Sequence, residues 1–533
     1  MKVLTLLVAV GSIAAPIGGA FAAEPEYYTL DTLHPTSPIS KDHATSFVSY
    51  SFEPAFWTEF FGEPESPRAL TFTLLKHLYD RGARPIIRAG GITMDSMIYD
   101  PSQKLSAVRT ENGKGGIYRV TIGPSFYKGW NNFPNGTAFV STLNFGNNSV
   151  GIAKDLAVAS HQLQGDKIIY YELGNEPTNY PAARWQRSTQ AYVDQWKSFT
   201  TQIGTAVSGA SRYVAFFGFG KWWASSATTD VTGLKVRPSD LIPAGVNSTG
   251  LVGQYSIHSY AFATCDPARE RRATIANILN HTDLARYADV EIYPSARAAM
   301  DSGAEWVVGE FNSIACSGKP NVSDTFAQAL WTADVELLYA VRNASSVHLH
   351  QGATLVFQSN QQLNTPGDDG SPGFSSYSLL YPVGSSKRGE ARVLPVFVSQ
   401  LLVVEALSYT DAIQMGGRIA SLPTPRGLKE SEFSGYAIYD PYTGLKRLVL
   451  LNMKPYYAGV GTRGTVLLDI GFHRGAVVKR MTAPSVDEKD SAKVMWAGQS
   501  FRDGKPVGKE TVEILETAEK VVIRDSEAVL VDF

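Results

Sequence analysis

The chain has 533 residues, of which 48 are basic and 50 acidic, so its formal net charge is −2. A charge this close to zero argues against nucleic acid or an anionic membrane surface as a partner, because both require a basic face. It equally disfavours a sulfated polyanion as a substrate.

The N-terminal segment has the pattern of a secretory signal peptide. Lys2 is followed by an apolar run over residues 3–17, and residues 20–22 read Ala-Phe-Ala, which suits cleavage before Ala23. The run is broken by glycine and proline and holds about 15 apolar residues, fewer than the roughly 20 of a membrane-spanning helix. We therefore expect residues 1–22 to be removed and the mature protein to be secreted and extracellular, without contact to a membrane.

Export would make two kinds of covalent modification possible. Six Asn-X-Ser/Thr sequons are candidate glycosylation sites, namely Asn135, Asn147, Asn247, Asn280, Asn321 and Asn343. The chain has two cysteines, Cys265 and Cys316. In an oxidising compartment we expect them to be bonded, with two buried thiols as the alternative.

Residues 46–410 alternate between two patterns that together predict βα units around a parallel sheet. Runs rich in β-branched and aromatic residues predict strands at residues 47–52, 85–88, 138–143, 167–172, 213–217, 252–257, 305–309 and 347–350. Helical periodicity predicts helices at residues 68–79, 152–163, 189–207, 271–285, 324–341 and 393–407. Eight strands close a barrel, so we expect an α/β protein with a (β/α)8 TIM barrel.

Three further segments depart from this alternation. Residues 100–137 are rich in Gly, Asn and aromatics and predict an elaborated loop near the active-site face. Residues 358–388 contain many helix and strand breakers and predict a surface loop over the same rim. Residues 411–533 show short alternating strands without a long helix, which predicts a C-terminal β-sandwich domain. The segment 23–45 before the barrel is a candidate for an additional strand of that domain.

Two glutamates follow expected strands of the barrel, where TIM barrels carry their functional groups. Glu176 follows the fourth strand and Glu310 the seventh. A single glutamate is usually a solvated surface charge, but two carboxylates facing one cavity are what glycoside hydrolysis requires. One protonates the leaving oxygen and the other attacks the anomeric carbon. Glu176, held between aromatic residues and Pro177, is the better candidate for the acid, and Asn175 can bond a sugar 2-hydroxyl.

Longer segments around these glutamates also have a recognisable sequence. They are residues 88–91 with Asp95, residues 171–177, residues 309–312 and residues 322–326. Together they resemble the clan A glycosidases and, within that clan, glycoside hydrolase family 79, whose C-terminal domain the β-rich tail also resembles. The resemblance implies retaining exo-β-glucuronidase activity, including activity on 4-O-methyl-glucuronides, with Glu176 as acid/base and Glu310 as nucleophile.

The resemblance also implies further properties of the site. The two carboxyl groups of a retaining enzyme lie roughly 5 to 5.5 Å apart. No metal and no organic cofactor is needed, and the expected partners are β-glucuronide-bearing glycans or small glucuronides. Recognition of the uronate carboxylate is expected near residues 313–320, without a match for individual residues.

Several side chains are weaker candidates for the site. His258 and Tyr260 are two residues apart on the sixth strand and so point the same way. We expect Tyr260, at the strand end, to donate a hydrogen bond to Glu310, and His258, deeper in the strand, to be a satisfied core histidine. The other candidates for substrate contacts are Glu53, His350 and Tyr377.

The cysteines fit the same arrangement, since Cys265 follows Tyr260 and Cys316 follows Glu310 in neighbouring loops of the catalytic face. We therefore predict a disulfide between them, worth about 4 kcal/mol in the chain-entropy treatment of a loop of roughly 50 residues.

Three alternative functions stay open at this point. The first is a clan A β-glycosidase acting on a neutral sugar. The second is a heparanase-like endo-glucuronidase, which the absence of a basic excess disfavours. The third is a carbohydrate-binding barrel without catalysis, which the presence of both glutamates disfavours.

Overall fold

The computed structural model describes residues 27–111, 117–210, 220–228, 233–353, 371, 373–407, 416–440, 444–472 and 474–533. The expected signal peptide, the expected strand at residues 213–217 and much of the expected loop at residues 358–388 lie outside these ranges. Within them, no helix combines the length and the apolar character needed to cross a bilayer.

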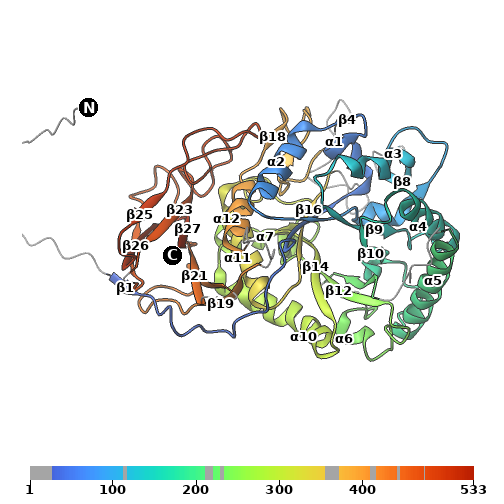
Figure 1. The fold of residues 1–533 in the computed structure, drawn as a ribbon, viewed down its shortest axis with the longest axis horizontal. Helices are drawn as coiled ribbons and strands as arrows, with labels where there is room; N and C mark the ends of the chain where they lie inside the picture. Colours follow the sequence, from blue (N-terminus) through green and yellow to red (C-terminus); the bar gives the residue numbers. More distant parts are fainter. Residues whose placement is uncertain are drawn as a thin grey trace, which may run out of the picture.

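Eight parallel strands close into a barrel, which confirms the TIM-barrel prediction (Figure 1). In chain order they are β2 (Val48–Phe52), β5 (Ile86–Arg88), β9 (Ala138–Leu143), β10 (Ile168–Leu173), β11 (Trp222–Ala227), β12 (Val252–Ser259), β14 (Glu305–Phe311) and β16 (Val347–Gln351). The barrel closes where β16 pairs with β2. Seven of these strands overlap the ranges expected from the sequence.

The fifth strand is the exception, because the expected residues 213–217 lie outside the described part of the chain. The fifth place in the barrel belongs to β11, whose sequence Trp-Trp-Ala-Ser-Ser-Ala has no β-branched residue and so gives little strand signal. Its pairing with β12 shifts register between Ser225 and Ala227, and Ser225 and Ser226 have φ of 82° and 48°. This bulge lies beside the fourth strand's end, where its carbonyl is used by the site.

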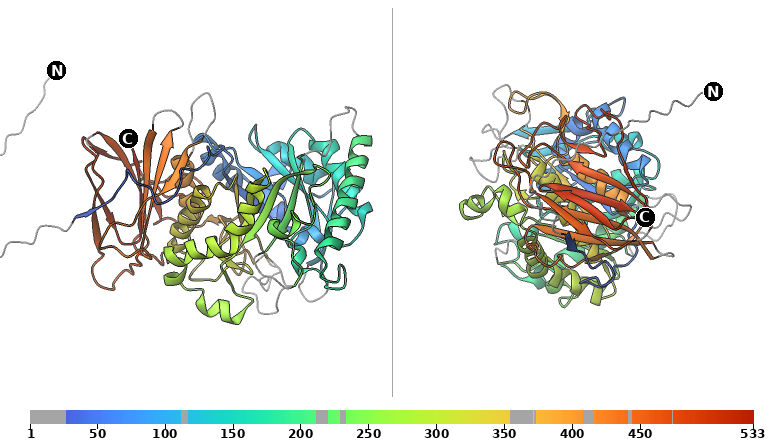
Figure 2. Two further views of the ribbon diagram at one scale, coloured as in Figure 1. Left: turned by 90° about the horizontal axis from the view of Figure 1, so that it is seen from below. Right: turned by 90° about the vertical axis from the view of Figure 1, so that its left-hand side faces the viewer.

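The main helices cover the outside of the barrel (Figures 1 and 2). They are α2 (Ala69–Asp80), α4 (Val150–Gln164), α5 (Thr189–Ala210), α10 (Tyr293–Asp301), α11 (Phe326–Val341) and α12 (Phe397–Leu407). Shorter helical segments are η1 (Pro54–Phe56), α1 (Trp57–Phe61), η2 (Ile92–Ser96), α3 (Pro124–Lys128), η3 (Gly129–Asn132), η4 (Pro177–Asn179), α6 (Pro238–Leu241) and η5 (Ala288–Ile292).

The helix expected over residues 271–285 is interrupted. The chain forms α7 (Pro267–Arg272), α8 (Ile275–Ile278) and α9 (His281–Tyr287) instead. Asp266, Thr274 and Asn280 each cap one of them, because each side chain accepts a hydrogen bond from the first turn that follows. Three helix starts within 15 residues divide the apolar periodicity into short pieces.

The expectation of a loop over residues 100–137 is also wrong for the part that the structure describes. A three-stranded sheet forms from β6 (Met97–Tyr99), β7 (Ala107–Glu111) and β8 (Ile117–Ile122), with β8 in the middle. Val120 and Ile122 are buried while Arg119 is exposed, so β8 shows the alternation of a half-buried strand. Small two-stranded sheets add β3 (Gly62–Glu63) to β4 (Ser66–Pro67) and β17 (Leu380–Tyr381) to β18 (Arg392–Val393).

The C-terminal domain contains two sheets (Figure 2, left). The larger has β19 (Arg418–Ser421), β20 (Phe433–Asp440), β21 (Gly444–Asn452), β27 (Glu527–Asp532), β23 (Ala476–Thr482), β24 (Met495–Trp496) and β25 (Glu513–Leu515). The smaller has β1 (Tyr27–Thr29), β22 (Thr465–Asp469) and β26 (Lys520–Arg524). Because β1 pairs in parallel with β22, the segment before the barrel supplies a strand to this domain.

Alternation along β21 explains how this domain attaches to the barrel. Leu448 and Leu450 belong to the core between the two sheets. Val449 and Leu451 point to the other face and belong to the barrel's own core cluster, and β21 contacts α12. One face of the larger sheet therefore closes the sandwich while the other packs on the barrel.

Candidate active site

The structure brings Glu176 and Glu310 together at the C-terminal ends of the barrel strands. Glu176 follows β10, and Glu310 is the second-to-last residue of β14. Three atoms lie within 4.8 Å of one another: a carboxylate oxygen of Glu176, a carboxylate oxygen of Glu310 and a ring nitrogen of His258. The two glutamates are thus close enough to act on one bond.

Glu310 lies in a buried environment that keeps it ionised. Its Oε2 accepts a hydrogen bond from Arg88 at 2.8 Å, and its Oε1 accepts one from the Tyr260 hydroxyl at 2.9 Å. Burial acts to raise the pKa of Glu310, but His350, His258 and Arg88 and the Tyr260 hydrogen bond hold that pKa well below its usual range. At pH 7 the positive charge beside Glu310 comes from Arg88. Burial lowers the pKa of His350 to about 4, which leaves that ring neutral at this pH.

Arg88, at the end of β5, is the centre of the buried network, and its side chain is fully buried. Besides Glu310, its guanidinium donates to Glu172 at 2.5 Å, to Ser51 at 2.9 Å and to Asn175 at 2.9 Å. One guanidinium charge is thus shared between two buried carboxylates. Arg88 is part of the motif at residues 88–91, but sequence alone does not show which carboxylates an arginine reaches, so its place in the site comes from the structure.

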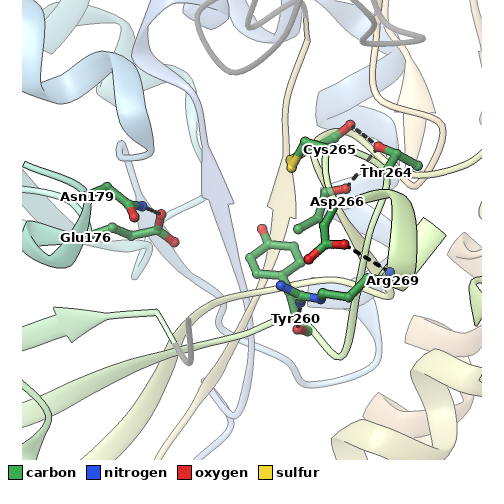
Figure 3. Close-up of a disulfide and its surroundings, with 9 residues drawn as sticks. Glu176, Asn179, Tyr260, Thr264, Cys265, Asp266 and Arg269 are labelled. Carbon is green, nitrogen blue, oxygen red and sulfur yellow. Dashed lines mark hydrogen bonds between the residues drawn. A yellow bond between two sulfur atoms is a disulfide. The ribbon is translucent and has the colours of Figure 1, made fainter. Parts of the chain in front are cut away.

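Glu176 lies in a different setting, on a backbone turn rather than in a strand. Its φ of 48° and ψ of 62° are left-handed, and its N–H donates to the Ser226 carbonyl of the β11 bulge at 3.0 Å. The preceding Gly174 has φ of 81°, and a Cβ there would lie 2.6 Å from the Tyr180 hydroxyl, so glycine is required. Asn179 donates to Glu176 Oε2 at 2.9 Å (Figure 3). Rigid backbone contacts thus direct this side chain towards Glu310.

His258 contacts Glu176, so the expectation of a satisfied core histidine is wrong. Its Nδ1 lies 3.0 Å from Glu176 Oε1, while its buried Nε2 has no hydrogen-bond partner among the described residues. The signal that identifies it is the two-residue spacing from Tyr260, the residue that follows β12, because this spacing predicts that both side chains point the same way.

The other predicted site residues lie around the same network. Glu53 is buried below Gly91, and its carboxylate accepts from the N–H groups of Ile92 and Thr93 at 3.0 and 3.1 Å. Burial raises the pKa of Glu53 to about 7, and the nearby charge of Glu310 adds to the effect. Glu53 is therefore committed to the turn after β5, which limits its free lone pairs for sugar hydroxyls.

His350, Tyr377 and Asn175 complete this group. The His350 ring lies between two carboxylates, with Nδ1 3.7 Å from Glu310 Oε2 and Nε2 3.7 Å from Glu53 Oε1. Tyr377 packs near it, with ring centroids 6.2 Å apart. Because Arg88 bonds the Asn175 side-chain oxygen, the group that Asn175 can offer to a ligand is its NH2 donor.

The loops after β12 and β14 are joined beside the site. Cys265 and Cys316 form a disulfide with their Cα atoms 5.9 Å apart. Short strands β13 (Phe262–Ala263) and β15 (Ile314–Ala315) pair in parallel just before the two cysteines. Figure 3 shows Tyr260 and Cys265 on the opposite side of the site from Glu176. The disulfide thus closes the extension of the two strands that carry Tyr260 and Glu310.

The same three side chains that meet at the centre have ligand types that metal ions accept. Glu176, His258 and Glu310 offer two carboxylates and an imidazole within 4.8 Å. However, Arg88 already bonds Glu310, and a cation placed here would be repelled by the guanidinium charge. The guanidinium charge thus disfavours a metal ion at this position.

Comparisons with known proteins agree with this geometry. A model of the glycosyl hydrolase family 79 C-terminal beta domain matches residues 435–530. A β-glucuronidase from Aspergillus niger is 30% identical over 369 residues, a match that spans 65% of this chain and 64% of that protein. A β-glucuronidase from Neurospora crassa is 25% identical over 530 residues, covering 90% and 88% of the two chains.

Solved structures share the fold. A 4-O-α-L-rhamnosyl-β-D-glucuronidase from Fusarium oxysporum 12S, solved as its Rha-GlcA complex, has a TM-score of 0.74 at 22% identity and covers 95% of this chain and 100% of that one. A family 51 arabinofuranosidase from Xanthomonas axonopodis pv. citri has a TM-score of 0.58 at 12% identity, covering 94% and 98%. The C-terminal domain thus matches the β domain of glycoside hydrolase family 79, and the chain is similar to two β-glucuronidases.

Proposed function

We propose that this protein is a secreted, retaining exo-β-glucuronidase that releases glucuronic acid, or its 4-O-methyl ether, from β-glucuronides of glycans and glycoconjugates. The observation that carries the proposal is the pairing of two unlike carboxylates. Glu310 is buried and bonded to Arg88, while Glu176 has no arginine or lysine partner among the described residues. Their oxygens approach within 4.8 Å, which favours the separation of retaining over inverting glycosidases.

The reaction proceeds by double displacement. In the first step, a Glu310 carboxylate oxygen attacks the anomeric carbon while Glu176 gives its proton to the glycosidic oxygen, so the aglycone leaves as an alcohol. In the second step, water gives a proton to Glu176 and attacks the same carbon, and the bond to Glu310 breaks. The sugar is released with its original anomeric configuration, and both glutamates return to their starting states.

The surroundings of each residue support these roles. Arg88 and Tyr260 stabilise the negative charge of Glu310, which must be ionised to attack. Glu176 is hydrogen-bonded to His258 and Asn179. An imidazole and an amide can each donate or accept a hydrogen bond, so they can bond both the protonated and the ionised carboxyl group. Asn175 is held by Arg88 beside both, where its NH2 can donate to the sugar 2-hydroxyl.

The uronate as the sugar is supported by the relatives. Two of the similar proteins are named β-glucuronidases, and the similar solved structure carries Rha-GlcA. A neutral β-glycoside and internal bonds of a glucuronate polymer are the competing substrates. The near-zero net charge disfavours the sulfated form of that polymer.

Secretion and glycosylation are part of the same proposal and are supported by the apolar N-terminal sequence and by the positions of the sequons. Four of the sequon asparagines are exposed, namely Asn135, Asn147, Asn247 and Asn321. Asn280 and Asn343 are partly buried, and Asn280 donates its amide to Asp283. Mass spectrometry of the exported protein before and after glycosidase treatment tests both claims.

The test of the reaction is hydrolysis of nitrophenyl β-glucuronide by the wild type, Glu176→Ala and Glu310→Ala proteins, each with and without azide. We expect turnover by the wild type, β-glucuronyl azide from Glu176→Ala and α-glucuronyl azide from Glu310→Ala. The opposite assignment of the two azides would exchange the roles.

The substrate class is tested in parallel with nitrophenyl β-glucoside, nitrophenyl β-xyloside and heparan sulfate. Preferred turnover of a neutral glycoside would keep the mechanism and discard the glucuronidase assignment. Shortening of heparan sulfate chains would instead support endo action.

A further inference from the structure

Asp95 is a carboxylate beside the active site that the reaction above does not use. It lies in η2, the 3-10 turn after β5, and is separated from Arg88 by the glycine-rich turn. Both of its oxygens accept hydrogen bonds from two other loops of the catalytic face. Oδ1 accepts the N–H groups of Phe145 and Gly146, at 3.2 and 3.1 Å, in the loop after β9.

The other oxygen reaches the acid/base loop itself. Oδ2 accepts the N–H of Asn175 at 3.1 Å and the hydroxyl of Tyr180 at 2.6 Å. These two donors stand on either side of Glu176 in the chain. One carboxylate thus joins the turn after β5 to the loops after β9 and β10, and it fixes the peptide that immediately precedes Glu176.

Close approach of backbone shows that this junction is tightly built. A Cβ on Gly146 would lie 2.5 Å from the Asp95 carbonyl oxygen. A Cβ on Gly174 would lie 2.6 Å from the Tyr180 hydroxyl and 2.8 Å from the Phe145 Cβ. Glycine at these two positions therefore lets the loops after β9 and β10 pack closely around Asp95 and Tyr180.

We propose that Asp95 is a positioning residue for the acid/base, which holds the Asn175 peptide so that Glu176 keeps its left-handed turn and reaches the glycosidic oxygen. Asn175 is fixed at two points, since Asp95 accepts its backbone N–H and Arg88 donates to its side chain. With this peptide fixed, the N–H of Glu176 meets the Ser226 carbonyl at 3.0 Å. The proposal rests on the proposed assignment of Glu176 as acid/base.

Asp95→Asn is the substitution that separates this role from packing, because it keeps the shape and removes two lone pairs. The four groups around Asp95 are all donors, so the new NH2 must face one pair of them. A hydroxyl can turn and accept, whereas an N–H cannot. The NH2 therefore settles towards Tyr180, and the N–H of Asn175 loses its acceptor. Tyr180→Phe instead removes the hydroxyl and keeps the N–H bond.

The readout is dependence on the leaving group. An alkyl alcohol needs a proton from the acid as it leaves, whereas dinitrophenolate does not. For Asp95→Asn we expect kcat/KM on methyl β-glucuronide to fall about 30-fold, within the usual worth of a general acid, and on dinitrophenyl β-glucuronide less than about 3-fold. Tyr180→Phe should also lower kcat/KM more on methyl β-glucuronide than on dinitrophenyl β-glucuronide, but by a smaller factor. Asp100→Asn, a matched change at a carboxylate bonded to Ser102, should leave both rates unchanged.

An equal fall on both substrates for Asp95→Asn would overturn the proposal, because a structural defect lowers all rates together. No fall on either would overturn it as well. If Asp95→Asn fails to fold, Tyr180→Phe decides by the same ratio. Failure of the proposed function is distinguishable, because the wild type would then not hydrolyse either glucuronide, and the same ratio would be measured on methyl and dinitrophenyl glycosides of the sugar that it does hydrolyse.

Discussion

The surroundings of Glu310 and of Glu176 differ although both residues end barrel strands. Glu310 belongs to a strand and is bonded to a buried arginine from β5, across the barrel, and to a tyrosine that follows the neighbouring strand β12. Glu176 stands on a left-handed turn and bonds a histidine and an asparagine. A fixed guanidinium charge suits a residue that stays ionised, while partners without a fixed charge suit one that gains and loses a proton.

The largest effect tests the ionised side of this comparison. Glu310→Gln keeps the shape of the side chain but cannot attack the anomeric carbon, so we expect kcat to fall on the order of 10⁴-fold or more. Glu305→Gln, at the exposed start of the same strand, is the matched control and should keep full activity. Steady-state kinetics on nitrophenyl β-glucuronide provide the measurement. Retained activity in Glu310→Gln would assign the nucleophile elsewhere.

Removal of Arg88 should make the surroundings of Glu310 more like those of Glu176, which has no arginine partner in the described part of the chain. Arg88→Met leaves two buried carboxylates, Glu310 and Glu172, without their cation, so we expect kcat/KM to fall about 100- to 1000-fold. The acid limb of the pH profile should move to higher pH, because the pKa of Glu310 is no longer lowered. An unchanged limb would show that other groups keep Glu310 ionised.

The same variant has a stability prediction with a definite sign. A carboxyl whose pKa is lowered by folding contributes stability above its unfolded pKa, and the contribution is lost as pH falls through the folded value. Arg88→Met should therefore destabilise by about 3–5 kcal/mol near pH 7 and by less at acid pH. Arg81→Met, which breaks a less buried pair with Glu405, is the control for loss of an ion pair.

A smaller effect is expected from Tyr260. Tyr260→Phe removes one hydrogen bond to a charged oxygen, worth about 1.5–3 kcal/mol, so kcat/KM should fall roughly 10- to 100-fold. The acid limb should again move upwards, since the pKa of Glu310 rises when this donor is lost. Tyr255→Phe, on the same strand but away from Glu310, should change neither quantity. A loss of activity with no shift of the limb would make Tyr260 a substrate contact rather than a partner of Glu310.

The smallest effect on the chemistry is expected from the disulfide. The double variant Cys265→Ser, Cys316→Ser should lower the free energy of unfolding by about 2–4 kcal/mol, because a loop with a sequence separation of 51 residues is no longer closed. Its kcat should change less than that of the Glu310, Arg88 and Tyr260 variants, since neither cysteine bonds the glutamates. Thermal unfolding with and without reductant gives the measurement. Equal unfolding temperatures for wild type and variant would contradict the stabilising role.

The sequence predicted the barrel and its two glutamates because the signals are local. Strand runs and the residues that follow them place Glu176 and Glu310 without knowledge of any contact. It also predicted the hydrogen bond from Tyr260 to Glu310, since strand alternation fixes the direction of a side chain. The same alternation applied to His258, but burial alone suggested a core residue there.

Other features depend on contacts that no local pattern encodes. The strand β11 has small and polar residues after its two tryptophans, and its place inside a closed barrel stabilises this part despite weak propensity. The roles of Arg88 and Asp95 depend on neighbours 80 or more residues away in sequence, such as Glu310 and Asn175. Periodicity predicts one helix over residues 271–285 because it does not distinguish the N-cap residues Thr274 and Asn280 from the interior of a helix.

The most direct test of the central claim is to trap the intermediate. A 2-deoxy-2-fluoro-β-glucuronide with a good leaving group should glycosylate the nucleophile in the first step, as the leaving group departs, and the glycosyl-enzyme should hydrolyse slowly in the second. Peptide mass spectrometry of the inactivated protein should place the sugar on Glu310. A label on Glu176 or Glu53, or turnover of a β-glucuronide with inverted configuration and no label, would contradict the account.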